Sequence, residues 1–287
     1  MSWGHQYIET NQVKLHCVTE GEGELVILLH GLLEFWYSWR YQLPALSKHF
    51  KVVVPDLRGY NDSDKPSSGY DLDTLSKDIQ GLIQSLGYSR AHIVGHDWGG
   101  TIAWHFAQRY PKQLQKLAIL SAPHPSLVRE AITSNWVQLQ RSWYLFSLQV
   151  PGLSEWLLQQ NLQTFLANLF QREAVRKGAF SKSDTEIYQA ALQKPGALQA
   201  VTQHARQCFN LREWFLPKRS ADRQIDQPTL VLWGEDDSLL SAQTLETLPA
   251  LLQHPCIKSV PFCGHWAQQE APQTVNRELT QFLKASA

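Results

Sequence analysis

Short apolar runs alternate with amphipathic stretches through the first 120 residues of the chain. The runs are rich in β-branched residues and bounded by turn residues, a pattern typical of buried strands. They are VKLHCVTEG (13–21), ELVILLHG (24–31), KVVVPD (51–56), AHIVGHD (91–97) and KLAILSAP (116–123). Helices are expected near residues 39–49 and 72–86 and directly after residue 97. Strands that alternate with helices predict an α/β fold, with a mostly parallel sheet flanked by helices on both faces.

The pattern changes between residues 128 and 216, where strand-like runs are almost absent. Amphipathic periodicity predicts successive helices there, at 135–149, 153–160, 161–173, 184–193 and 196–215, with breaks at VPG and KPG. The strand pattern returns in TLVLWGEDD (229–237) and KSVPFCGHW (258–266), and a last helix is expected at 272–286.

We therefore expect a core of residues 1–124 and 226–287 and an inserted all-helical cap of residues 125–225. Because the insertion adds no strand, its expected place is over the carboxyl ends of the strands, where open α/β sheets bind ligands.

Composition narrows the range of partners. The 26 basic and 26 acidic residues cancel and are scattered, so neither a nucleic acid nor an anionic membrane surface is expected. The four cysteines form no CxxC pair, and the amino terminus lacks a signal-peptide pattern, which together favour a soluble cytoplasmic protein with reduced thiols. The expected partners are a small apolar molecule and water, in a monomer or homodimer, without cofactor or metal.

GHDWGG (95–100) lies where a buried strand turns into a helix. Turns of the pattern Gly-x-nucleophile-x-Gly usually carry a serine at the centre, but here the centre is Asp97. A lone aspartate in a turn is often only a helix cap. Gly95 and Gly99, however, allow a close approach of strand and helix that a cap does not require. Asp97 is therefore a candidate nucleophile.

Two further acid-base groups follow predicted strands, in the order acid and then histidine. His265 follows KSVPF near the carboxyl terminus, and Asp237 follows TLVLWG. We favour Asp237 to orient His265, although Asp236 and Glu235 compete for that role and an acidic run is often only a solvated surface.

HGLLEFW (30–36) follows another buried strand. A His-Gly turn at this point can aim the backbone N–H of Leu32 into the site, and the N–H of Trp98 offers a second donor. Together they would form an oxyanion hole, although an ordinary tight turn explains the motif as well.

With these motifs the chain resembles the α/β-hydrolase superfamily, and within it the epoxide hydrolases and their dehalogenase relatives. The resemblance rests on a series of motifs that occur in the order of the family and span nearly the whole chain. They are HGLLEFWYSWRYQLP, DLRGYNDSDKP, GHDWGG, APHP, QVPG, WGEDD and CGHW.

The resemblance implies an α/β-hydrolase fold with a helical cap and a catalytic triad. Asp97 would be the nucleophile, His265 the base and Asp237 its partner, with the N–H groups of Leu32 and Trp98 as oxyanion donors. A carboxylate is already ionised at neutral pH and can attack a saturated carbon without activation. The implied reaction opens an epoxide to form an ester on Asp97, which water activated by His265 then hydrolyses to a diol.

The leaving alkoxide needs an acid from the cap, where the family commonly has two tyrosines. Tyr144 matches the first by its distance from QVPG, although packing in the cap explains this residue too. At the second position the chain departs from the family, with Ala205 before Arg206 and His204 one step earlier. His204 is a possible second donor if its helix is rotated, and an imidazole can act as an acid near neutral pH, but an exposed helix histidine is the more common case.

Two other features bear on the pocket. Leu33 stands where the family has proline, which leaves the aim of the Leu32 N–H open. Trp36 and Trp266 are expected to line or border the pocket, and core packing explains each of them equally well.

Two alternatives to an epoxide hydrolase remain open. A dehalogenase would use the same nucleophile, but haloalkane enzymes commonly have a polar residue where Leu32 stands, and haloacetate enzymes have an arginine beside the nucleophile that GHDWGGTIAW lacks. A non-catalytic or slow small-molecule receptor on the same fold is suggested by the missing second tyrosine.

Overall fold

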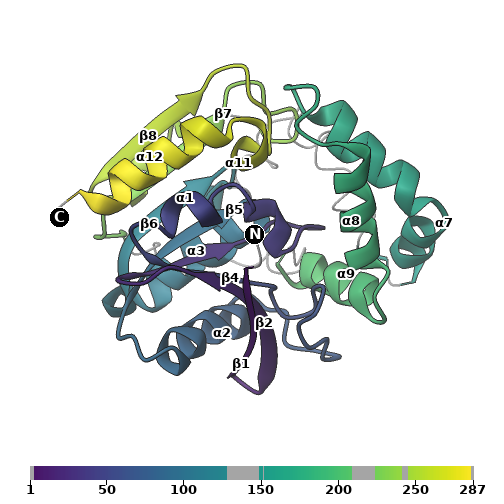
Figure 1. Cartoon of the computed structure of the whole chain (residues 1–287), viewed down its shortest axis with the longest axis horizontal. Coiled ribbons are helices and arrows are strands. Elements are labelled where there is room, and N and C mark those ends of the chain that lie inside the picture. Colours follow the sequence, from purple (N-terminus) through teal and green to yellow (C-terminus); the bar gives the residue numbers. More distant parts are fainter. Residues whose placement is uncertain (1–2, 128–148, 151, 209–223, 241–244, 286–287) are drawn as a thin grey trace.

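The computed structural model describes residues 3–127, 149–150, 152–208, 224–240 and 245–285. An eight-stranded sheet runs through the molecule in the order β1-β2-β4-β3-β5-β6-β7-β8 (Figure 1). The strands are β1 (Gly4–Thr10), β2 (Val13–Glu20), β3 (Leu25–Leu29), β4 (Lys51–Pro55), β5 (Ala91–His96), β6 (Leu114–Leu120), β7 (Thr229–Gly234) and β8 (Pro255–Val260). β1 and β4 pair with β2 antiparallel and all other pairs are parallel, so the predicted mostly parallel sheet is confirmed.

Strand β1 was not among the predicted strands. It pairs with β2 through a two-residue turn in which Asn11 and Gln12 both have positive φ, of 43° and 64°. Positive φ at both central residues is the type I′ geometry that matches the twist of a hairpin. Since nearly all side chains of β1 are exposed or half-exposed, the strand carries no apolar alternation that could reveal it.

Helices cover both faces of the sheet. Side chains of β3 alternate, with Leu25, Ile27 and Leu29 packing in the cluster that includes α2 (Leu72–Ser85) and α3 (Asp97–Arg109). Val26 and Leu28 pack on the other face with α1 (Leu43–Leu46) and α12 (Pro272–Lys284). This alternation is the period of two that a strand buried on both faces requires.

The helix expected at 39–49 is much shorter than predicted. The chain forms a 3-10 turn, η1 (Trp36–Trp39), and then the four-residue helix α1. Pro44 lies in the first turn of α1, where a helix does not need the N–H that proline lacks. A longer helix from residue 39 would need that N–H as a donor, so the chain forms two short elements instead. The remaining short elements are η2 (Pro111–Gln113), η5 (Leu248–Leu251) and α11 (Ala267–Glu270).

Between β6 and β7 the described chain is helical. The elements are α7 (Leu153–Ala167), a π-helical turn η3 (Asn168–Arg172), α8 (Lys182–Leu192) and α9 (Ala197–Cys208), and α7, α8 and α9 lie together to one side of the sheet (Figure 1). Asn161 has non-helical φ and ψ, which kinks α7 at the predicted break between 153–160 and 161–173. The predicted helix at 135–149 lies outside the described residues except for Gln149.

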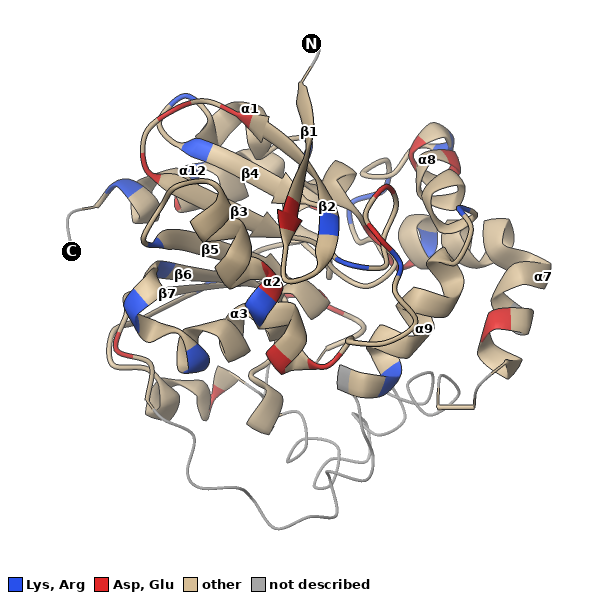
Figure 2. Ribbon diagram, turned by 90° about the horizontal axis from the view of Figure 1, so that it is seen from below, with Lys and Arg blue, Asp and Glu red and all other residues tan. Residues whose placement is uncertain are grey.

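The inserted helices α7–α9 contact the loops that follow the carboxyl ends of the parallel strands. His204 of α9 contacts Tyr60, which follows β4, and Trp98, which follows β5. Figure 2 shows Lys and Arg interspersed with Asp and Glu over both the sheet region and these helices. Among the described residues, no helix has the length and apolar character needed to cross a bilayer. Cys17, Cys256 and Cys263 are free thiols, as expected.

A buried ion pair ties three parts of the core together. Nε and Nη2 of Arg58, which follows β4, donate to the Asp78 carboxylate on α2 at 2.5 and 2.6 Å, and both side chains are buried. Asn11 in the β1–β2 turn donates to the same carboxylate at 2.8 Å. A bidentate pair of this kind leaves a strongly uncompensated charge if one partner is removed.

We therefore expect Asp78→Asn to lower the free energy of unfolding by about 3 kcal/mol or more, because Arg58 stays buried without its counter-charge. Urea unfolding followed by circular dichroism measures the change. Asp73→Asn on the same helix is the matched control, since its contact with Arg109 is long, at 3.7 Å, and exposed. Equal losses in the two variants would contradict the role given to burial.

Candidate active site

Asp97 occupies a strained turn between β5 and α3. Its φ is +48°, a left-handed conformation that is rare outside glycine and concentrates at functional sites. A Cβ on Gly95 would lie 2.4 Å from the carbonyl oxygen of Gly99, and one on Gly99 would lie 2.3 Å from that of Leu29. These distances exclude any side chain, so the close approach of strand and helix expected from GHDWGG is confirmed.

His265 lies between Asp97 and Asp237. Its Nδ1 is 2.9 Å from Oδ2 of Asp237, and its Nε2 is 3.6 Å from Oδ1 of Asp97. Three loops at the carboxyl edge of the sheet thus bring together residues that are far apart in the sequence. The side chain of Asp97 remains 22% exposed, which leaves its carboxylate accessible to a small molecule.

The acid that contacts His265 is Asp237 and neither of its acidic neighbours. Oδ1 of Asp237 accepts hydrogen bonds from the backbone N–H groups of Leu239 and Leu240, at 2.9 Å each, which fixes the carboxylate and leaves Oδ2 for the imidazole. Glu235 and Asp236 are exposed, and Glu235 accepts instead from the Ser259 hydroxyl. The structure thus brings Asp237 to His265, as the favoured prediction had it.

The three groups stabilise each other's charged forms. Burial of the imidazole disfavours its charged form, but the charge and hydrogen bond of Asp237, and then those of Asp97, raise the pKa of His265 well above 6.5. Burial acts to raise the pKa of Asp97, but the hydrogen bond and charge of His265, with smaller contributions from His96 and the Leu32 N–H, hold it below its usual 3.8. An ionised Asp97 is therefore available at neutral pH.

The turn after β3 aims a backbone donor at Asp97. The N–H of Leu32 donates to Oδ2 of Asp97 at 2.9 Å. Leu33 adopts a φ of +63°, which a proline ring cannot reach. The backbone of this turn therefore differs from one that contains proline, but the Leu32 N–H still points at the carboxylate. Trp98 is in the first turn of α3, where backbone N–H groups have no acceptor within the helix. Its N–H as a second oxyanion donor remains a prediction.

Two buried polar residues beside this turn were missed by the sequence analysis. Glu34 accepts from the backbone N–H of Gly31 at 2.8 Å and from Nδ1 of His96 at 2.9 Å, while Nε2 of His96 faces the carbonyl oxygen of His265 at 3.0 Å. Both ring nitrogens of His96 thus face oxygen atoms, so the ring links Glu34 to the backbone of His265. The signal in the sequence was a single glutamate in the otherwise apolar LLEFW.

His204 is fully buried, so the expectation that it is an exposed helix residue is wrong. Its Nδ1 is 3.1 Å from the Tyr60 hydroxyl, and its ring stands edge-on to Trp98 with centroids 5.5 Å apart. Within the described part of the chain, its Nε2 has no hydrogen-bond partner. Burial, and next the charge of His30, lower the pKa of His204 to about 3. The imidazole is therefore neutral, and it is not the acid near neutral pH that the sequence analysis considered.

Three further residues were predicted to belong to the site, namely Trp36, Trp266 and Tyr144. Trp266 is buried and packs perpendicular to His265, with ring centroids 5.2 Å apart. The ring of Trp36 contacts Trp3 and His5 near the amino terminus, at 5.2 and 5.4 Å. The place of both tryptophans in a substrate pocket stays a prediction. Tyr144 lies outside the described residues.

A cluster of possible metal ligands lies among the described residues. The ligand atoms of His16, Asp56 and Asp62 lie within 4.8 Å of one another, but His16 already bonds Asp56 at 2.7 Å and Asp62 pairs with Lys194. The cluster is thus accounted for by contacts within the protein.

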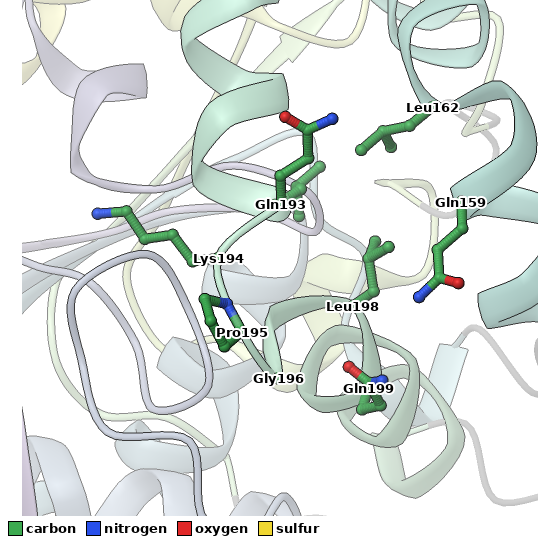
Figure 3. Close-up of a pocket in the computed structure, with 9 residues that line it drawn as sticks. Gln159, Leu162, Gln193, Lys194, Pro195, Gly196, Leu198 and Gln199 are labelled. Atoms are coloured by element: carbon green, nitrogen blue, oxygen red, sulfur yellow. The ribbon is translucent and has the colours of Figure 1, made fainter.

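The inserted helices also line an open pocket of about 310 Å³ (Figure 3). Figure 3 shows Leu162 and Leu198 beside the amides of Gln159, Gln193 and Gln199 around it. The lining includes none of the predicted site residues, so the candidate active site rests on the side-chain geometry around Asp97.

A comparison with known families identifies the fold. A model of the alpha/beta hydrolase fold matches residues 24–272, from β3 to the start of α12. The chain belongs to the α/β-hydrolase fold family.

Several relatives of this hydrolase bear the name epoxide hydrolase. Epoxide hydrolase 4 of Mus musculus is 37% identical to it over 286 residues, which cover 96% of this chain and 78% of the relative. Epoxide hydrolase 1 of Caenorhabditis elegans is 34% identical over 289 residues, covering 98% of this chain and 70% of the relative. A crystal structure of a Bacillus megaterium epoxide hydrolase in complex with an inhibitor matches with a TM-score of 0.89 at 31% identity, covering 98% of this chain and all of that one.

The charge coupling in this hydrolase predicts the effect of removing the Asp97 carboxylate. Asp97→Asn should lower the pKa of His265, because one of the negative charges that favour the imidazolium is lost while the burial that disfavours it remains. Nuclear magnetic resonance titration of ring-labelled histidine measures the change. Asp236→Asn is the matched control and should leave the His265 titration unaltered; a similar shift in both variants would mean that general charge, and not this contact, sets the pKa.

Proposed function

We propose that this hydrolase converts epoxides to vicinal diols through a covalent ester on Asp97. The observation that carries the proposal is an accessible, ionised carboxylate at a strand-to-helix turn, with His265 held between it and Asp237. A serine at this turn would suit acyl transfer, whereas a carboxylate suits displacement at a saturated carbon. The named relatives support the epoxide as substrate class.

The two oxygens of Asp97 have different surroundings, which assigns them different parts in the first step. Oδ2 is held by the Leu32 N–H, and Oδ1 faces His265 at 3.6 Å. We take Oδ1 to attack the epoxide carbon and break its bond to the ring oxygen, which leaves as an alkoxide. Oδ2 then becomes the ester carbonyl oxygen, already beside the donors that would stabilise a tetrahedral oxyanion.

His265 acts in the second step. Ester formation removes the negative charge of Asp97, one of the groups that raise the pKa of His265, so the imidazole becomes more readily neutral at this stage. A neutral imidazole accepts a proton from water as the water oxygen attacks Cγ of the ester. Asp237 stabilises the resulting imidazolium, which gives its proton to the departing alcohol oxygen as the tetrahedral intermediate collapses and the diol leaves. The imidazole then takes the proton of the newly formed Asp97 carboxylic acid, which regenerates the ionised Asp97.

We further propose that residues 125–225 form a cap over the core of residues 1–124 and 226–287, and that the cap supplies the donors for the alkoxide. Tyr144 is the first of these donors by resemblance; its hydroxyl gives the alkoxide a proton and regains one from solvent, into which His265 releases its own. His204 is the second, supported by its full burial, its contact with Trp98 and its unpartnered Nε2. Since its pKa is about 3, His204 acts as a neutral hydrogen-bond donor that stabilises the developing negative charge.

The ester intermediate should accumulate when His265 is replaced. In His265→Gln, Asp97 can still attack, but water is no longer activated, so the enzyme should gain the mass of one epoxide molecule at Asp97. Mass spectrometry of the intact protein and of its peptides measures the adduct. His254→Gln, which alters an exposed histidine, should show no adduct.

The origin of the diol oxygen tests the same intermediate in the unmodified enzyme. In a single turnover in heavy-oxygen water, the label should enter Asp97 and be absent from the first diol. Label in the first diol would mean direct attack by water and would overturn the ester. Halide release from haloalkanes or haloacetate without turnover of any styrene-type, aliphatic or fatty-acid epoxide would overturn the proposed substrate class.

Loss of the His204 donor should slow ester formation and leave ester hydrolysis unchanged. We expect His204→Phe, which keeps a ring of similar size, to slow alkylation about 100-fold, because the alkoxide loses one partner. Rapid-quench measurement of both steps separates them. Gln203→Ala on the same helix is the control, and an unaltered alkylation rate in His204→Phe would remove His204 from the mechanism.

A further inference from the structure

Glu270, at the end of α11, has no place in the reaction described above, yet its carboxylate is buried and strongly hydrogen-bonded. It accepts from four backbone N–H groups. The donors are Val175 at 2.8 Å, Arg176 at 3.0 Å, Gly264 at 3.2 Å and Trp266 at 3.3 Å. Among the described residues no cation pairs with it, so backbone dipoles compensate its charge.

Two of the four donors flank His265 directly. Gly264 and Trp266 donate to Oε2 and Oε1 of Glu270, so one carboxylate holds the main chain on both sides of the imidazole. The packing is tight, since a Cβ on Gly264 would lie 2.9 Å from Oε1. The carbonyl oxygen of His265 is itself bonded by His96. The backbone that carries the imidazole is therefore fixed at three successive residues.

The other two donors belong to the segment that connects two of the inserted helices. Val175 and Arg176 follow the π-helical turn η3 and precede α8, and both donate to Oε2, the oxygen that also holds Gly264. The Arg176 side chain donates to the carbonyl oxygens of Pro261 and Phe262, just before the His265 loop. A single carboxylate oxygen thus joins this segment to the loop that carries His265.

We propose that Glu270 is a positioning residue. It couples the position of His265 to the position of the segment at 174–176, because its carboxylate bonds the backbone of both. This inference rests on the proposed function, because it concerns the delivery of His265 Nε2 to the water that hydrolyses the ester. A displacement of about 1 Å at such a group can slow a reaction about 100-fold. Asp97 attacks the epoxide without His265, so the effect falls on the second step alone.

The direct test is Glu270→Gln, which keeps the size of the side chain but replaces one acceptor oxygen by an NH₂ donor. We expect ester hydrolysis to slow about 10- to 100-fold, while the alkylation rate and the fraction of active sites stay near those of the unmodified enzyme. The alkyl-enzyme then accumulates in rapid-quench experiments. Glu278→Gln is the matched control, because Glu278 bonds the side chains of Lys258 and Arg277, and both steps should be unaltered.

A second variant disturbs the contact between Gly264 and the Glu270 carboxylate by changing the glycine. Gly264→Ala places a Cβ 2.9 Å from Oε1 of Glu270, so the carboxylate or the loop must shift. It should show the same selective loss of ester hydrolysis. If either variant lost alkylation and hydrolysis by the same factor, or if folded variants hydrolysed the ester at the original rate, the positioning role would be overturned.

Amide hydrogen exchange tests the link that Glu270 makes between the two segments, and it requires no catalytic turnover. In Glu270→Gln the amides of Val175, Arg176, Gly264 and Trp266 should exchange faster together, while those of β3 and β5 keep their protection. Faster exchange at 264 and 266 alone would overturn the link to the inserted helices. If the unmodified enzyme opened no epoxide, the proposed function would be refuted. The exchange experiment would still test whether Glu270 links the two segments.

Discussion

The whole site depends on the approach of two pieces of backbone at GHDWGG. Gly95 and Gly99 lie so close to neighbouring main chain that any Cβ would overlap it, and this contact holds Asp97 at a φ of +48°. The strain places a carboxylate at the start of α3, where the helix dipole and the Leu32 N–H favour its negative charge. The charge is then compensated by fixed dipoles and by His265, so the carboxylate stays ionised while remaining exposed enough to meet a substrate.

The loops around Asp97 are held by the same kind of interaction. Three carboxylates accept backbone N–H groups: Glu34 holds the turn that carries Leu32, Asp237 holds its own loop, and Glu270 holds both sides of His265. A carboxylate that bonds several N–H groups fixes main chain in one arrangement, and backbone donors cannot swing away as a lysine can. The Leu32 N–H and the imidazole of His265 are thus positioned by buried acids.

Much of this architecture could be predicted from the sequence, because strands buried on two faces and a glycine-rich turn leave strong patterns. Sequence patterns do not predict elements or contacts whose burial follows no regular period along the chain. β1 is exposed along most of its length, the helix expected at 39–49 is divided by Pro44, and the burial of His204 depends on helices far away in the sequence. Asp237 could not be separated from its acidic neighbours with certainty, since the choice depends on which carboxylate the turn aims at His265. Glu270 bonds backbone N–H groups, and Glu34 and His96 bond each other as well as the backbone; such contacts require no motif.

The low pKa of His204 explains how an imidazole can lie near the Asp97 carboxylate without neutralising it. The charge of Asp97 favours protonation of His204, but full burial and the charge of His30 outweigh it and leave the ring neutral at a pKa of about 3. His265 therefore remains the cationic partner of Asp97, and its Nδ1 lies 2.9 Å from Oδ2 of Asp237. In the tautomer that the proposal requires, Tyr60 donates to Nδ1 of His204, and Nε2 carries the hydrogen toward the substrate. The ring then donates a hydrogen bond without adding positive charge, so it stabilises the alkoxide as it forms while Asp97 keeps its negative charge for the attack.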